Sequence, residues 1–225
     1  MSEGICYIIS GGDLFGPPIE KKEEDYVIAA DAGYRHLEAL QVESDMVIGD
    51  FDSIMSVPQH EYLVRLNKEK DDTDTLAAIR LGLEKGYKEF RIYGATGGMR
   101  IDHTLANIQT LAFLLDFDAR GYLYNQDTIM TMIRDEQLDF DESYHGYISV
   151  FSYSEVSVGV NLRGLKYELT DATVTSGFPI GVSNEFTGVA SNVSVKNGTL
   201  LVTYQNPLCK SEIKLEEDVT DEVIN

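Results

Sequence analysis

Two short acidic segments contain the residues whose types and spacing most clearly predict chemistry. Gly49-Asp50-Phe51-Asp52-Ser53 follows an apolar run, and Lys70-Asp71-Asp72-Thr73-Asp74 precedes a run with apolar residues at helical spacing. Neighbouring carboxylates repel one another unless a cation lies between them. Magnesium suits such a group, because it takes a few carboxylates and completes its coordination with water and substrate phosphates. The two segments therefore predict a magnesium–nucleotide site.

An ordinary solvated turn is the alternative interpretation of either segment taken alone. The chain has 38 aspartate and glutamate residues among 225, so some of them fall together by chance. Both segments lie beside predicted regular elements, and open α/β sheets bind ligands at the ends of their strands. This placement favours the metal site.

Charge and composition narrow the class of protein. A formal charge of −20 argues against a nucleic-acid-binding surface, which needs exposed lysine and arginine. No run approaches the roughly 20 apolar residues of a membrane span, and the first ten residues lack a secretory signal pattern. Cys6 and Cys209 lie near opposite ends and predict no disulfide framework. We therefore expect a cytoplasmic protein with neither nucleic-acid nor membrane partners.

Strand and helix signals alternate over the first part of the chain. We expect strands at 5–9, 26–30, 46–48, 89–93 and 121–124, and helices through Leu37 and Leu40, at 73–85 and at 102–115. Alternation at this spacing predicts a parallel sheet covered by helices. The first predicted domain is therefore an α/β nucleotide-binding domain at 1–138.

The pattern changes near Gly146, beyond which apolar and polar residues alternate and no helix signal follows. We expect strands at 146–153 and 166–174, and Asn197-Gly198 predicts a two-residue hairpin between strands at about 193–195 and 200–202. Short strands without helices favour an all-β sandwich or jelly-roll-like domain. The predicted boundaries are 139–210 for this domain and 211–225 for an acidic tail.

Small or acidic residues follow four of the predicted strands, at 10–12, 31–33, 49–53 and 94–98. Glycines let a backbone approach phosphates, and a helix that begins just after them offers free N–H groups. Each glycine cluster alone is better explained by a tight turn, so the argument depends on their coincidence at one sheet edge. The chain contains neither the G-x-x-x-x-G-K-[ST] pattern of a P-loop nor G-x-G-x-x-G.

Two further segments carry polar residues of interest. Arg100 is placed to hold a phosphate with two N–H groups, and Asp102 suits either a ligand contact or a helix N-cap. His103 has no apparent nucleophile partner, and the polar segment 181–186 is explained by a surface loop. The residues alone predict a nucleotide-dependent phosphotransfer enzyme with an accessory β domain, and they do not name the acceptor.

The order of these motifs resembles that of the thiamine pyrophosphokinase family. The resemblance spans about Cys6 to Tyr204 and includes Asp31-Ala32-Gly33, Gly49 to Ser53, Asp71 to Asp74, Gly94 to Gly98 with Arg100 and Asp102, and Ser183-Asn184-Glu185-Phe186. Animal members of the family differ in having a neutral residue where Asp72 stands, so the resemblance assigns Asp72 no essential role.

The resemblance implies transfer of a pyrophosphoryl group from ATP to thiamine, which gives thiamine diphosphate and AMP. It also implies a homodimer whose active sites are shared between the two chains. The residues that it assigns are Asp50, Asp52 and Asp74 for Mg²⁺ and catalysis, Asp102 as a further catalytic carboxylate, Gly11, Asp31, Thr73 and Arg100 around ATP, and Ser183 and Asn184 at the thiamine pyrimidine.

Two other classes stay open on the residues alone. A D-x-D sugar-nucleotide transferase would use the same carboxylates to hold a metal on a nucleoside diphosphate. A non-catalytic nucleotide-sensing module with a β interaction domain would bind nucleotide without forming AMP. A thermal-protection experiment separates the transferase from the kinase, because ATP should stabilise the kinase and a nucleotide sugar should stabilise the transferase.

Overall fold

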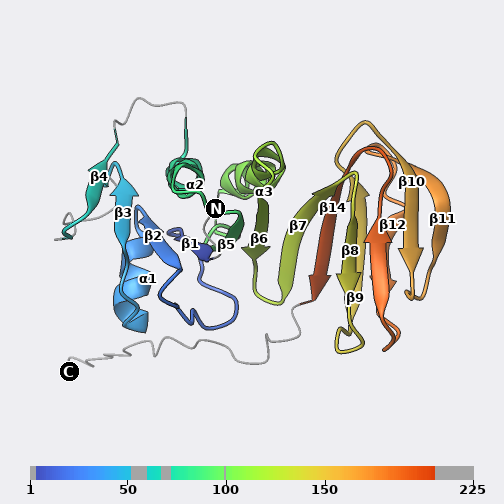
Figure 1. Ribbon diagram of the computed structural model, residues 1–225, viewed down its shortest axis with the longest axis horizontal. Coiled ribbons are helices and arrows are strands. Elements are labelled where there is room, and N and C mark those ends of the chain that lie inside the picture. Colours follow the sequence, from blue (N-terminus) through green and yellow to red (C-terminus); the bar gives the residue numbers. More distant parts are fainter. Residues whose placement is uncertain (1–3, 52–59, 67–71, 99, 206–225) are drawn as a thin grey trace, which may run out of the picture.

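The computed structural model describes residues 4–51, 60–66, 72–98 and 100–205 (Figure 1). A ten-stranded sheet runs along the molecule in the order β12-β9-β14-β7-β6-β5-β1-β2-β3-β4, and a second sheet has the order β11-β10-β13-β8. The combination confirms the expected fold class, an α/β part followed by an all-β part. The predicted tail at 211–225, Asp52, Asp71 and Cys209 lie outside the described residues.

The first part of the chain forms the parallel half of the large sheet. Its strands are β1 (Ile5–Ile9), β2 (Tyr26–Ala30), β3 (Met46–Gly49), β4 (Leu63–Arg65), β5 (Glu89–Tyr93) and β6 (Arg120–Tyr124). Its helices are α1 (Gly33–Leu40), α2 (Asp74–Glu84) and α3 (Ile101–Leu115). None of these helices in the described part has the length and apolar content that a bilayer crossing requires.

Helices cover both faces of the parallel half. Ile8, Ile28 and Ile48 pack with the buried residues of α2 and α3, whereas the alternate residues Ile9 and Val27 pack with α1. Figure 1 shows α2 and α3 side by side on one face and α1 on the other. Burial on both faces explains why these strands are near-continuous apolar runs in the sequence.

The direction in which the strands are added reverses between β1 and β5. From β1 the chain moves outward through β2 and β3 to β4, and it then returns to place β5 on the opposite side of β1. Ligands of open α/β sheets bind at such a switch point, beyond the carboxyl ends of the strands. The fold therefore directs attention to the ends of β1 and β5.

The antiparallel half continues the same large sheet. β7 (Thr128–Arg134) pairs with β6, and it is followed by β14 (Thr199–Gln205), β9 (Tyr147–Ser152) and β12 (Gly181–Glu185). The second sheet contains β8 (Gln137–Phe140), β10 (Val156–Arg163), β11 (Leu169–Thr175) and β13 (Ser191–Ser194). Apolar residues from the two sheets share one core, so this part is a β-sandwich.

Two local expectations are wrong. The residues on either side of Asn197-Gly198 do not form a hairpin, because β13 pairs with β8 and β10 while β14 pairs with β7 and β9. The turn instead carries the chain from one sheet to the other. Segment 181–186 is not a surface loop, since most of it forms β12. The predicted domain boundary at 138 falls inside β8 and stays a prediction.

Candidate active site

The ends of β1 and β5 are in direct backbone contact. The Ser10 amide donates to the Tyr93 carbonyl at 2.8 Å, and the Gly12 amide donates to the Gly94 carbonyl at 2.7 Å. A Cβ atom on Gly12 would lie only 2.7 Å from that same carbonyl oxygen, which explains why this position is glycine. The His36 ring, from α1, lies 2.8 Å from the Gly12 carbonyl oxygen and links α1 to this turn. We call this region, with the ends of β2 and β3, the strand-end crevice.

The ends of β2 and β3 complete the crevice. The Asp31 amide donates to the Ile48 carbonyl at 2.8 Å, and a Cβ atom on Gly49 would lie 3.0 Å from the Asp31 Cα. Asp31 and Phe51 both have a positive φ, 48° and 60°, which is uncommon for residues with side chains. Strained backbone of this kind clusters at functional sites. Asp31 and Asp50 are half-buried here.

The start of α2 is fixed to the end of β1. Thr73 is the N-cap, and its hydroxyl accepts a hydrogen bond from the Leu76 amide at 3.2 Å. The buried hydroxyls of Ser10 and Thr75 lie 2.8 Å apart and join the first turn of α2 to β1. Asp74 lies in that first turn, where the helix dipole favours a negative charge. The structure therefore brings Thr73 and Asp74 to the same sheet edge as Gly11.

Asp72 has a partner outside the crevice. Its carboxylate forms an ion pair with Arg80 of α2 at 2.7 Å. This contact explains the residue as a local support for the start of α2, in agreement with the absence of an assigned role.

The loop after β5 is shaped for close approach of a ligand. Gly94, Gly97 and Gly98 all have positive φ, and a Cβ atom on Gly98 would meet nothing within 4 Å. The first residues of the loop are anchored to α3, because the buried Asn107 side-chain amide donates to the Ala95 carbonyl at 2.8 Å. Gly98 therefore faces open space while the base of the loop is fixed, which suits phosphate binding by backbone N–H groups.

Arg100 and Asp102 pair with each other at the start of α3. The shortest of their hydrogen bonds joins Arg100 Nη2 to Asp102 Oδ2 at 2.6 Å, and both side chains are exposed. The helix begins at Ile101 with Arg100 at the N-cap position, so of the two roles that Asp102 suited, the N-cap is wrong. Hydrogen bonds from Arg100 lower the pKa of Asp102 to about 2. Asp102 is thus a weak base that stays charged.

Ser183 and Asn184 lie on β12, far along the large sheet. The exposed Ser183 has a φ of 57°, whereas Asn184 is buried. The Asn184 side chain accepts from the Tyr167 amide at 2.9 Å and donates to the Tyr167 carbonyl at 2.6 Å. Its amide group therefore holds the backbone of Tyr167, a residue that is 61% exposed beside β12. Sequence reasoning missed Tyr167, since this pairing links residues 17 positions apart.

One chain does not bring these two groups of residues together. Five strand-to-strand steps separate β12 from β5 in the large sheet. At about 4.8 Å per step they lie roughly 24 Å apart, and the ends of β2 and β3 are farther still. Figure 1 shows β12 and β3 toward opposite ends of the molecule.

The metal assignment stays a prediction. Among residues 4–51, 60–66, 72–98 and 100–205, no three histidine, cysteine, aspartate or glutamate side chains form a group that could hold a metal. Asp50 and Asp74 supply hard oxygen donors at the crevice, and the third predicted ligand, Asp52, is outside the described residues. Two carboxylates, with the remaining positions filled by water and phosphates, fit the coordination chemistry of Mg²⁺.

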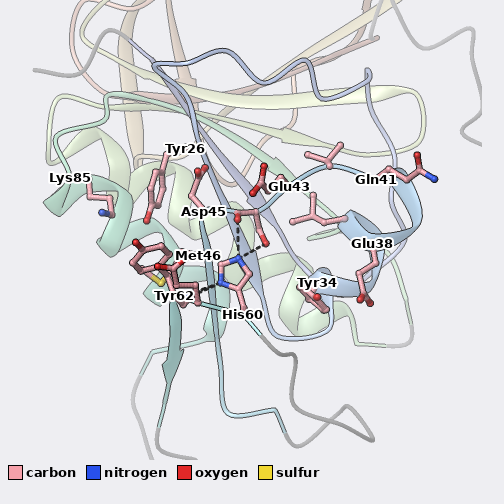
Figure 2. Close-up of a pocket in the computed structure, with 14 residues that line it drawn as sticks. Tyr26, Tyr34, Glu38, Gln41, Glu43, Asp45, Met46, His60, Tyr62 and Lys85 are labelled. Atoms are coloured by element: carbon pink, nitrogen blue, oxygen red, sulfur yellow. Dashed lines mark hydrogen bonds between the residues drawn. The ribbon is translucent and has the colours of Figure 1, made fainter.

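A large cavity lies at the opposite edge of the parallel sheet, where β2 and β3 begin. It has a volume of about 770 Å³, and Figure 2 shows Tyr26, Lys85, Asp45, His60 and Glu38 around it. Two of its polar side chains already have partners in the protein. His60 Nε2 lies 2.9 Å from the Ser44 carbonyl oxygen, and Asp45 accepts from the Val27 amide and from Lys21, both at 2.7 Å. None of the sequence-predicted site residues lines this cavity.

Comparisons with known proteins agree with the sequence resemblance. Residues 19–123 match the family described as "Thiamin pyrophosphokinase, catalytic domain", and residues 135–200 match "Thiamin pyrophosphokinase, vitamin B1 binding domain". The thiamine pyrophosphokinase of Bacillus subtilis (strain 168) is 31% identical over 161 residues, which are 68% of this chain and 75% of the relative.

Solved structures are similar over nearly the whole length. A crystal structure of thiamine pyrophosphokinase from Bacillus subtilis has a TM-score of 0.81 at 27% identity, and the match covers 91% of this chain and 99% of that one. A thiamin pyrophosphokinase family protein from Enterococcus faecalis has a TM-score of 0.77 at 29% identity and covers 90% and 98%.

Proposed function

The chain belongs to the thiamin pyrophosphokinase family, and from this premise we propose that it transfers a pyrophosphoryl group from ATP to thiamine. The products would be thiamine diphosphate and AMP. The observation that carries the proposal is the strand-end crevice, where glycine turns, two helix starts and half-buried carboxylates lie at one sheet edge. Such an edge binds phosphates and a bridging divalent cation.

We assign the ATP phosphates to the backbone of the crevice. Gly11 and the turn at Gly97 and Gly98 let the backbone approach the ligand closely, while Arg100 has N–H groups that suit phosphate oxygens. Thr73 contributes by capping α2, which directs the first amides of that helix toward the crevice. Asp31 borders the same space at the end of β2.

Asp50, Asp52 and Asp74 would hold Mg²⁺, which supplies neutralisation of the phosphate charge when bound. The remaining chemistry is positioning, because transfer through a loose transition state asks little of a protein base. The resemblance assigns Asp102 as a catalytic carboxylate, but its low pKa makes it a weak base for the thiamine hydroxyl proton. We therefore propose that Asp102 orients Arg100 through their paired hydrogen bonds.

Thiamine would bind where β12 of one chain faces the crevice of another. A separation of roughly 24 Å within one chain prevents Ser183 from reaching a pyrophosphate held at β5. A twofold dimer presents the same surface twice, so each β12 could complete the partner chain's crevice. Exposed apolar side chains gather on β12 and the segments next to it, as expected of an interface: Tyr147, Tyr167, Phe178, Ile180 and Val182.

The decisive experiment incubates the full chain with ATP, MgCl₂ and thiamine and separates the products. We expect AMP and thiamine diphosphate in equal amounts, and no turnover when the metal is chelated. ADP with thiamine monophosphate would contradict pyrophosphoryl transfer. A parallel sample with a nucleotide sugar tests the transferase alternative, and binding of ATP without AMP formation would favour a sensing module.

A further inference from the structure

A second concave region lies on the face of the large sheet that also carries α1 and the second sheet. It is lined by residues of β1, β5, β6, β8 and β14 and by the loop at Pro17 and Pro18, and its volume is about 720 Å³. We call it the aromatic trough. Tyr7 and Arg91 are register partners on its floor, on the amino-terminal side of Ile9 and Tyr93, where the two strands end. The trough is therefore distinct from the strand-end crevice.

Two groups of rings form the walls of the trough. On one side, Tyr124 and Tyr7 line the trough and pack on the buried Tyr93, with ring centroids 4.6 Å and 6.4 Å from that of Tyr93. On the other side, the Phe140 ring contacts Tyr204 edge-on at 5.1 Å, and it contacts Tyr144 in the same way. Because the rings brace one another, they offer fixed apolar surfaces to a flat ligand.

Two tyrosines that line the trough, Tyr7 and Tyr204, can offer hydroxyl donors. Tyr7 is 2% exposed and Tyr204 is 5% exposed, and both line the trough. Within the described part of the chain, neither phenol oxygen forms a hydrogen bond with another residue. Burial raises the pKa of both phenols, so each keeps its proton as a donor. Each phenol therefore has an O–H donor to offer a ligand in the trough.

Arg91 adds directed donors to the floor. Its Nε and Nη2 atoms both lie 3.1 Å from the same oxygen of Glu89, so most of the guanidinium N–H groups are left for another acceptor. Its Cζ atom lies 5.9 Å from the centre of the Tyr7 ring. Glu89 neutralises its charge, while Glu20 and Asp139 outnumber Lys22 at the lining. An anionic ligand is therefore disfavoured, and neutral acceptor atoms are favoured.

We propose that the aromatic trough is a second ligand site, which takes an uncharged, planar heteroaromatic compound with hydrogen-bond acceptors on its ring. The rings of Tyr124 and Phe140 stack on its faces, and Arg91 with the hydroxyls of Tyr7 and Tyr204 binds its acceptors. The volume lies within the range of small-molecule sites. The proposal is independent of the reaction at the strand-end crevice, since it uses none of that site's residues.

Riboflavin is a suitable probe, because its ring system is flat, uncharged and rich in acceptors. Its emission is quenched when it stacks on tyrosine, and the chain contains no tryptophan to complicate the signal. We expect saturable quenching on titration with the full chain. Arg91→Met should raise Kd about 10-fold or more, and Tyr204→Phe, which retains the ring, should raise it about 3-fold.

Matched substitutions away from the trough are the controls. Arg163→Met in the second sheet and Tyr62→Phe at the opposite-edge cavity should leave the riboflavin Kd unchanged within about 2-fold. Circular dichroism and thermal unfolding establish that each variant is folded. If Arg91→Met does not fold, Tyr204→Phe decides the outcome.

Several results would overturn the proposal. One is the absence of saturable quenching up to about 1 mM riboflavin, because a Kd weaker than this would not indicate a specific site. Equal losses in the control variants would show non-specific stacking. Displacement of riboflavin by ATP with Mg²⁺ would place the probe in the strand-end crevice. A lower mass by light scattering in Arg91→Met would identify a second copy of the chain as the occupant.

Discussion

The two edges of the parallel sheet are built in opposite ways. At the carboxyl edge, backbone atoms at the ends of β1, β2, β3 and β5 are in direct contact. At the amino edge, long side chains from α1, Tyr62 and Lys85 surround a cavity of about 770 Å³ (Figure 2). The comparison teaches that a large hollow can lie away from every residue that the sequence predicts for the site. Phosphates are bound by main-chain N–H groups on turns and helix starts, and such sites are shallow without their ligand.

The largest expected difference is in turnover, when carboxylates at the carboxyl edge and at the amino edge are replaced in turn. Asp50→Asn, Asp52→Asn and Asp74→Asn should each lower turnover about 100-fold or more, because fixed charge at the transition state is lost. Glu61→Gln, on the amino-edge cavity, should change turnover by less than about 2-fold. AMP release at saturating ATP, thiamine and magnesium measures both.

Two outcomes would contradict the assignment of the reaction to the carboxyl edge. Near-normal turnover in Asp50→Asn would remove it as a metal ligand. A large loss in Glu61→Gln would instead move the reactive site to the amino edge.

The second test compares the crevice with β12. Asp74→Asn is one inactive variant, and Ser183→Ala combined with Tyr167→Ala is the other; Asn184 is left intact because it holds the Tyr167 backbone. When the two are unfolded and refolded together, half of the dimers are mixed, and each has one site free of defects. About a quarter of the wild-type activity should return if sites are shared between chains.

Differential tags confirm that mixed dimers have formed. With mixed dimers present and no activity recovered, the shared site would be excluded, and thiamine would have to bind within one chain.

A smaller difference is expected in stability. Thr75→Val removes the buried hydrogen bond to Ser10 at the carboxyl edge and should lower the free energy of unfolding by about 1–2 kcal/mol. Ser44→Ala removes a longer contact, 3.3 Å to His60, at the amino edge and should cost less than about 0.5 kcal/mol. Urea unfolding with an unchanged m-value measures the two losses, and equal losses would contradict the tighter construction of the carboxyl edge.

The smallest expected effect is on the pKa of Asp102, which forms an exposed ion pair with Arg100 beside the crevice. Carbon NMR should place the titration of Asp102 near pH 2, and Arg100→Gln should return its pKa toward the ordinary value of 3.8. Because the pKa is lowered, the interaction is fully present above that ordinary value and is lost as the pH falls toward 2. Asp102 therefore contributes no pH dependence of turnover between about pH 6 and 8.

The pKa of Asp141, which is lowered by its own contacts with Ser143, is the internal control. It should not respond to Arg100→Gln. An unshifted Asp102 in the wild-type chain would contradict the pairing.

The parallel half could be predicted from the sequence, because strands that are buried on both faces consist of consecutive apolar residues. The runs at Ile5–Ile9, Tyr26–Ala30 and Glu89–Tyr93 are apolar and end in small or acidic residues, so their bounds agree with the structure. The strand Leu63–Arg65 was missed, since it has only three residues and is largely exposed at the sheet edge. An edge strand of this kind has no pattern to detect.

The β-sandwich was predictable as a class but not in its pairing. Asn197-Gly198 has the local chemistry of a hairpin, yet the Gly198 amide donates to Asp135 and the Asn197 carbonyl accepts from Val158. These partners are 63 and 39 positions away in the chain. Which sheet a strand joins depends on such distant contacts, and a two-residue turn signal does not contain them.

The position of the candidate site residues in the fold could be predicted from the sequence, whereas some of their side-chain contacts could not. Gly11, Asp31, Asp50, Thr73 and Asp74 reach one edge because parallel strands end together. The pairing of Asp102 with Arg100 and the clamp of Asn184 on Tyr167 depend on side-chain geometry, which spacing alone does not determine.

The pairing of β6 with β7 also bears on how the protein unfolds. This antiparallel ladder joins the parallel and antiparallel halves into one hydrogen-bonded sheet, with Thr131 and Met132 buried beside it. Opening either half would expose the other's ladder, so amide protons in β6 and β7 should exchange through the same cooperative event. A chain cut at residue 138 would keep β7 but lose β14, leaving an unprotected edge prone to aggregation.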